Sequence, residues 1–153
     1  MGQGSKFDSS LSTRGGRANL ITASDIASGD SLAKEILSEM KEDGIKFSKD
    51  KIVFAAKLDN GNKIFLEKDA VNHIISRHVN DFKNAFGVER HEISSLLSDT
   101  ISKGKLISSF RKDSNGKEGY RNIYYYKGRY AVVYGIASNG YIETAFPDDY
   151  YGG

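Results

Sequence analysis

The alternation of hydrophobic and polar residues predicts strands and helices in the last two thirds of this 153-residue chain. Two strand-like stretches, 51–58 and 63–66, flank Asn60-Gly61, which favours a hairpin because both residues accept positive φ angles. Helical periodicity follows over about 67–82 and 89–103. Four more strand candidates then alternate with short turns, at 105–112, 120–127, 130–137 and 141–146. This order predicts an α+β domain, in which N-terminal helices pack on one face of a twisted antiparallel β-sheet meander.

The N-terminal third has a different composition. Residues 1–50 hold nine Ser and six Gly but only two aromatic residues, so little apolar surface is available to offset the entropy of ordering the chain. One short helix is expected at 31–43, where Leu32, Ile36 and Met40 recur at helical spacing. We therefore expect residues 1–44 to be a flexible Ser/Gly-rich linker with a short helix, and residues 45–153 to form the folded domain.

Composition excludes several classes of protein. The chain has no cysteine, which removes disulfide scaffolds, cysteine zinc sites, iron–sulfur clusters and thiol nucleophiles. No apolar run approaches the ~20 residues needed to span a bilayer, and the N-terminus lacks the apolar core of a signal peptide. The formal charge of +2 by itself indicates no partner.

The charge is unevenly distributed. Residues 103–129 contain eight basic and two acidic residues, a net charge of +6, and all nine tyrosines lie between Tyr120 and Tyr151. Cations beside aromatic rings on a sheet suit RNA, because cations contact phosphates and rings stack on unpaired bases. Tyrosine is also an ordinary strand residue, and turn lysines keep sheet edges soluble. The residues expected to contact RNA are Lys105, Arg111, Lys127, Arg129 and Tyr126.

Two of the three histidines lie in one predicted helix, in the run His73-Ile74-Ile75-Ser76-Arg77-His78. On a helical wheel His78 falls inside the apolar stripe and should point toward the sheet, whereas His73 and Arg77 share a more exposed flank. Metal-free RNA cleavage needs a base, an acid and a cation, and histidine suits both proton roles. Each histidine also has a purely structural reading, His78 as a hydrogen-bonded core residue and His73 as a solvated one.

Other chemistries fit less well. His73 and His78 are five residues apart and no Glu follows His73, unlike the zinc-protease helix motif. No Gly-x-Ser-x-Gly elbow, phosphate loop or dinucleotide fingerprint is present. Neither a metal nor a cofactor is expected.

The order of short motifs resembles a known family. Ile52-Val53-Phe54, Asn60-Gly61, Phe65-Leu66-Glu67, His73-Ile74, Arg77-His78 and Asp81-Phe82 are similar to the catalytic C-terminal domains of bacterial polymorphic toxins. Arg121, Ser138-Asn139-Gly140-Tyr141-Ile142 and Ala145-Phe146-Pro147 continue the likeness. The group it most resembles is the type-50 polymorphic toxin domain, which is related to barnase, EndoU, colicin E5/D and RelE. The likeness covers roughly residues 45–147, and the chain has Ala145-Phe146-Pro147 where the type-50 group has Ala-Asn-Pro.

The resemblance implies that residues 45–153 are the ribonuclease domain of a toxin used in interbacterial competition. Such domains sit at the end of a larger secreted or cell-surface carrier, act in the cytoplasm of the target bacterium on RNA, often tRNA, and are neutralised by a cognate immunity protein. That protein is expected to be acidic, so that it can cover the +6 region. The resemblance assigns catalysis to His73, Arg77, His78, Arg121 and Thr144.

The expected activity is therefore metal-independent RNA cleavage by 2′-hydroxyl attack, which leaves a 2′,3′-cyclic phosphate. Two alternatives remain open. An ADP-ribosyltransferase or other NAD-consuming toxin could use Arg121 and Glu143, although no Glu-x-Glu or Ser-Thr-Ser signature is present. A non-catalytic RNA- or protein-binding module would use the basic, tyrosine-rich sheet and would bind in a salt-sensitive manner without cutting.

Overall fold

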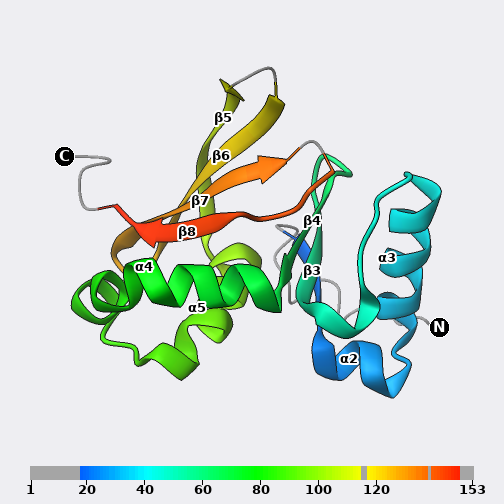
Figure 1. The fold of residues 1–153 in the computed structure, drawn as a ribbon, viewed down its shortest axis with the longest axis horizontal. Helices are drawn as coiled ribbons and strands as arrows, with labels where there is room; N and C mark the ends of the chain where they lie inside the picture. The colour runs from blue at the N-terminus through cyan, green and yellow to red at the C-terminus, as the bar shows by residue number, and fades with distance from the viewer. Residues whose placement is uncertain (1–17, 115–116, 138, 149–153) are drawn as a thin grey trace.

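The computed structural model describes residues 18–114, 117–137 and 139–148 (Figure 1). Its elements are, in chain order, β2 (Ala18–Thr22), α2 (Ala23–Ser28), α3 (Ser31–Glu42), η1 (Lys49–Lys51), β3 (Ile52–Leu58), β4 (Lys63–Glu67), α4 (Lys68–Phe86), η2 (Arg90–Glu92), α5 (Ile93–Lys103), β5 (Lys105–Ser114), β6 (Lys117–Tyr126), β7 (Arg129–Ala137) and β8 (Thr144–Pro147). The α+β class is confirmed, and the helices and strands expected after residue 50 are present with ends shifted by a few residues.

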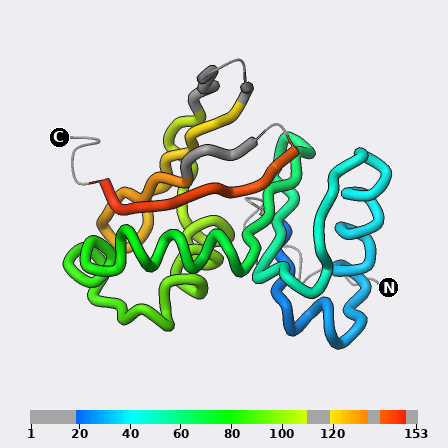
Figure 2. The backbone as a smooth tube through the Cα atoms, viewed as in Figure 1, coloured from blue at the N-terminus to red at the C-terminus, as the bar shows by residue number. Residues whose placement is uncertain are grey.

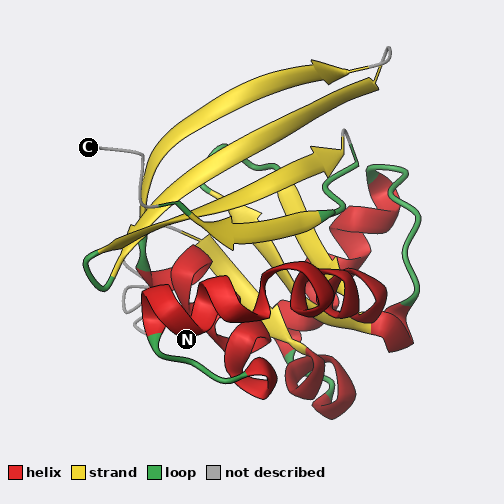
Figure 3. Cartoon of the chain, turned by 60° about the vertical axis from the view of Figure 1, so that its left-hand side comes forward, coloured by secondary structure: helices red, strands yellow, loops and turns green. Residues whose placement is uncertain are grey.

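The strands form two antiparallel sheets. The first sheet has the order β2-β3-β4, and the second sheet has the order β5-β6-β7-β8. Figure 3 shows the second sheet as a curved layer standing above the helices. The expected antiparallel meander of the last four strands is confirmed as the second sheet. The 52–67 hairpin pairs with β2 in the first sheet.

Backbone hydrogen bonds join the two sheets. The amide of Phe65 in β4 donates to the carbonyl of Gly140 at 2.9 Å, and the amide of Ile142 donates to the carbonyl of Phe65 at 3.0 Å. Gly140 has φ of +90°, and an added Cβ would overlap the carbonyl oxygen of Lys63. Only glycine allows this close approach. The chain then runs on into β8, which lies along α4 (Figure 2).

Helices cover both faces of the first sheet. The expectation of helices on one face concerned the meander, which is the second sheet. One core cluster joins Ile36 and Met40 of α3 to Ile21, Ala55 and Phe65 of the first sheet. The other cluster lies on the opposite face and contains residues of α4, α5 and both sheets. Successive strand residues point to opposite faces, so one strand serves both clusters.

Part of the expected linker is folded. Within 1–44 the structure has the expected helix, α3, and also β2 and α2, neither of which the sequence analysis anticipated. Ile21 of β2 is fully buried, and α2 begins with a capping box between Thr22 and Asp25. The expected boundary at residue 44 does not separate two packing units, because Met40 and Ile52 belong to one cluster. Residues 1–17 lie outside the described residues. None of the described helices has the length and apolarity needed to cross a membrane.

Candidate functional site

The helix with two histidines lies beside the last strand. α4 and β8 run side by side (Figures 1 and 3), and the ring of His78 packs against Phe146 of β8 with 5.2 Å between ring centroids. The His78 side chain is 23% exposed, while Ile74 and Phe82, one turn away on either side, are fully buried. The predicted orientation of His78 toward the sheet is confirmed, and its ring lies where the core meets solvent.

An acidic residue holds one nitrogen of this ring. His78 Nδ1 lies 2.9 Å from Asp81 Oδ2, one helical turn further along α4. A carboxylate accepts hydrogen bonds, so Asp81 favours the tautomer in which Nδ1 carries the proton. The lone pair of the neutral ring is then on Nε2. This arrangement of an acid behind an imidazole is the one that general-base catalysis uses.

His73 and Arg77 lie elsewhere on the same helix. Both side chains are exposed, as the helical wheel predicts. Five residues separate His73 from His78, which places them about 140° apart around the helix and about 7.5 Å apart along it. The structure does not bring the two imidazoles together, whereas Arg77 is the immediate chain neighbour of His78.

The register of the second sheet places the other candidates on one face. Phe146 lies opposite Val132, and Val132 lies opposite Ile123, so these three side chains share a face. Thr144 and Arg121 are two residues from this row and share the same face, with β7 between them. The other face of the sheet contributes to the core. We call the face that carries Arg121, Ile123, Val132, Thr144 and Phe146 the outer face, although Ile123 and Val132 on it are themselves buried.

Thr144 has an unusual hydroxyl. Its Oγ1 is buried and has no hydrogen-bond partner, and it is the one such side-chain atom among the residues that the structure describes. A buried hydroxyl without a partner costs about 1–3 kcal/mol. Such a group calls for an explanation, and a catalytic role is one. Thr144 is two residues from Phe146, so the hydroxyl lies about 7 Å along the strand from the His78 contact.

The residues expected to bind RNA do not share one surface. Lys105 lies opposite Tyr125, on the outer face. Tyr126 lies opposite Arg129, and its ring packs against the core on the other face, 5.5 Å from Lys127 Nζ. Arg111 belongs to β5, but its side chain is outside the described part of the structure. Lys105 is therefore the expected RNA contact that shares a face with Arg121.

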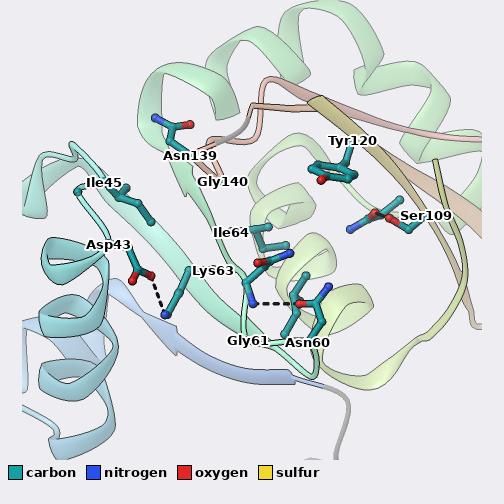
Figure 4. A pocket seen from close by; sticks show the side chains of 14 residues that line it. Asp43, Ile45, Asn60, Gly61, Lys63, Ile64, Ser109, Tyr120, Asn139 and Gly140 are labelled. Atoms are coloured by element: carbon teal, nitrogen blue, oxygen red, sulfur yellow. Dashed lines mark hydrogen bonds and ion pairs between the residues drawn. The ribbon is translucent and has the colours of Figure 1, made fainter. Parts of the chain in front are cut away.

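A separate cleft opens between the two sheets, on the side away from the outer face. It has a volume of about 750 Å³, and Figure 4 shows Asn60, Lys63, Ser109, Tyr120 and Asn139 around it. Neither histidine of α4 lines it. Its one lysine is already paired, with Lys63 Nζ 2.8 Å from Asp43 and 3.4 Å from Glu39. The cleft offers amides, hydroxyls and one neutralised cation, and it lacks an imidazole for proton transfer near neutral pH.

Sequence reasoning missed two partners of His78. Asp81 follows it at the i, i+3 spacing that brings helical side chains together, so the pair was visible in the sequence. Phe146 is distant in the chain, and no local pattern identifies it as a neighbour.

No protein-family model matches the chain, and no curated protein matches it in sequence. Within the described ranges, no group of three or more His, Cys, Asp or Glu side chains could hold a metal ion.

Proposed function

We propose that this protein is an endoribonuclease that cleaves RNA without a metal ion, by attack of the 2′-hydroxyl on the adjacent phosphate. The observation that carries the proposal is the His78–Asp81 pair against Phe146. It supplies an oriented imidazole beside a strand that also holds a hydroxyl donor. An exposed histidine on a solvated helix would need neither partner.

In the proposed reaction the O2′–P bond forms and the P–O5′ bond breaks. His78 Nε2 takes the 2′-hydroxyl proton, and Asp81 stabilises the imidazolium that results. The departing 5′-oxygen takes a proton from an imidazolium, either His78 itself or His73. The products are a 2′,3′-cyclic phosphate and a 5′-hydroxyl. The separation of the two rings around α4 favours His78 for both transfers and His73 as a phosphate contact.

The negative charge that develops on the non-bridging oxygens of the phosphate needs hydrogen-bond donors and cations. Thr144 Oγ1 has a hydrogen bond left to donate because it has no partner within the described residues. Since the atom is buried, a local movement must expose it to the phosphate, and a single positioned donor of this kind is worth about 10²–10³ in rate. Arg121 shares the outer face with Thr144 and adds positive charge. Arg77 is exposed beside His78 and is a second cation at the helix.

The test is cleavage of total RNA in EDTA, with the ends of the products identified chemically. We expect 2′,3′-cyclic phosphate and 5′-hydroxyl ends. His78→Ala should lower the rate by about 10²–10⁴-fold, and Asp81→Asn should lower it while preserving RNA binding. If His73→Ala is as severe as His78→Ala, His73 is the second proton carrier; if it changes only KM, it is a phosphate contact.

The matched control is His91→Ala. His91 is the remaining histidine, it is exposed in η2, and it lies outside α4. Undiminished cutting by both α4 variants would contradict the assignment. Salt-sensitive binding without any cutting would favour a non-catalytic RNA-binding module, and loss of NAD without loss of RNA would favour an NAD-consuming toxin.

We further propose that the domain is a toxin of interbacterial competition that acts on RNA, tRNA foremost, in the cytoplasm of a target bacterium. The support is the motif order from residue 52 to residue 147, together with the histidine site. On this proposal a larger secreted or cell-surface protein carries the domain, and an acidic immunity protein neutralises it. Expression in a bacterial cytoplasm should arrest growth, and His78→Ala should abolish the arrest. Co-expression of a small acidic protein from the neighbouring reading frame should restore growth.

A further inference from the structure

Three strands place a cation and two aromatic rings in one row on the outer face. Lys105 of β5 lies opposite Tyr125 of β6, and Tyr125 lies opposite Tyr130 of β7. Directly opposed residues of an antiparallel pair point to the same face. The Tyr125 and Tyr130 rings are in contact, with centroids 5.1 Å apart and planes inclined at 56°.

This row belongs to the same face as the proposed catalytic residues. Tyr125 is two residues from Ile123 on β6, and Tyr130 is two residues from Val132 on β7. Ile123, Val132 and Phe146 lie opposite one another on β6, β7 and β8, and Phe146 contacts His78. Each step of two strand residues covers about 7 Å. The tyrosine pair is therefore one row from the His78–Phe146 contact and two rows from Arg121.

Core packing does not account for Tyr125. Its side chain is 42% exposed, and among the described residues it is one of three large hydrophobic side chains with this degree of exposure, together with Leu106 and Ile107. The next residue, Tyr126, packs against the core from the other face. An exposed aromatic ring that a second ring supports is a surface on which a planar group can stack.

We infer that Tyr125, supported by Tyr130 and flanked by Lys105, forms a subsite that stacks an unpaired base of the RNA substrate. The base lies on the Tyr125 ring, and Lys105 contacts a phosphate of the same strand. This inference rests on the proposed function, because it places the subsite next to the cleavage site. It replaces Tyr126 with Tyr125 as the aromatic contact to RNA.

The subsite favours single-stranded RNA over duplex RNA, since only an unstacked base can reach the ring. The subsite contacts the π face of a base and forms no hydrogen bonds with its edge, so it discriminates weakly among bases. Selection of a particular RNA then depends on where an unpaired nucleotide lies relative to the scissile phosphate.

The experiment measures binding of a short, fluorescein-labelled, single-stranded 2′-O-methyl RNA by fluorescence anisotropy. This probe has no free 2′-hydroxyl and cannot be cut, so binding is separated from chemistry. Tyr125→Leu should raise the Kd about 5- to 150-fold, and Tyr125→Phe, which keeps a ring, should leave it within about twofold. Lys105→Gln should raise the Kd and reduce its dependence on salt.

The control is Leu106→Ala, which removes a neighbouring exposed apolar side chain that lies opposite Tyr124, on the inner face. It should bind the probe as the wild type does, and thermal melting of each variant checks that the fold is intact. The inference is overturned if folded Tyr125→Leu binds like the wild type, or if the wild type does not bind the probe.

Cleavage measured in parallel separates the two proposals. If Tyr125→Leu weakens binding but the wild type cuts no RNA, the stacking subsite stands and the ribonuclease proposal fails. If the wild type cuts RNA and Tyr125→Leu changes neither Kd nor KM, the ribonuclease stands and the subsite fails.

Discussion

Replacing Gly140 with alanine tests how the last strand is held beside α4. Gly140 has φ of +90°, and its carbonyl accepts the hydrogen bond from Phe65 that joins the two sheets. An alanine side chain would overlap the carbonyl oxygen of Lys63. The 140–142 segment must then move away from β4, and the join is lost.

The expected loss of unfolding free energy in Gly140→Ala has two parts. A non-glycine residue held at this φ costs about 1–3 kcal/mol. The two joining hydrogen bonds, from Phe65 to Gly140 and from Ile142 to Phe65, contribute about 0.5–1.5 kcal/mol each. Together the substitution should lower the free energy of unfolding by about 2–6 kcal/mol.

Gly61→Ala is a matched control for the first part alone. Gly61 has φ of +89°, close to that of Gly140, but no heavy atom lies within 4 Å of an added Cβ. Gly61→Ala should therefore lower the free energy of unfolding only by the backbone strain, about 1–3 kcal/mol. The excess for Gly140→Ala should be about 1–3 kcal/mol, or roughly 2–12 °C in Tm.

Thermal unfolding followed by circular dichroism gives both Tm values. Gly140→Ala should also lower RNA cleavage, because β8 carries Thr144 and the Phe146 ring that packs on His78. Equal losses of Tm for the two variants would show, against this expectation, that the overlap with Lys63 costs no stability.

Three further outcomes follow from single side chains. Thr144→Val removes a buried hydroxyl that has no partner within the described residues, so Tm should stay equal or rise while the RNA cleavage rate falls about 10²-fold; melts and rates on one preparation check both. Hydrogen bonds from Lys57 and Lys63 lower the pKa of Glu39 below 4.5, so its contribution to stability is present above that pH and is lost as the pH falls through the lower folded value. In urea unfolding at about pH 6, Glu39→Gln should be less stable than the wild type, and the difference in unfolding free energy should disappear toward about pH 3. Burial raises the pKa of Tyr124 to about 12, so the folded state resists ionisation and stability is lost as the pH rises above the unfolded value of about 10. Tyr124→Phe should lose less stability than the wild type between about pH 9 and about pH 11, as urea unfolding at each pH would show.

The sequence predicted local structure better than it predicted neighbours. The hairpin at Asn60-Gly61, the helix with both histidines and the strands of the second sheet each leave a periodic or turn signal, and each was found. β2 was missed, because its five residues lie in a stretch rich in serine and glycine and are held by pairing with β3. That pairing is a long-range contact with no trace in the local composition.

In the candidate site too, features set by local structure were predicted and features set by long-range contacts were not. Helical spacing predicted that His78 faces the sheet and that His73 and Arg77 are exposed, since these follow from one helix alone. Which tyrosine faces which way depends on strand register, and a shift of one residue exchanges Tyr125 with Tyr126. Registers are set by bulges such as the one between Tyr120 and Asn122, and composition does not reveal them. The contact between His78 and Phe146 likewise depends on the join at Gly140.

The proposed mechanism requires His78, oriented by Asp81, to cleave RNA without a metal ion. The most direct measurement is the initial rate of cleavage of one defined RNA in EDTA by wild type, His78→Ala and His91→Ala. We expect the wild type to cut in EDTA, His91→Ala to cut at the wild-type rate, and His78→Ala to be slower by about 10²–10⁴-fold. Equal rates for the two histidine variants, or no cutting by the wild type, would contradict the proposed mechanism.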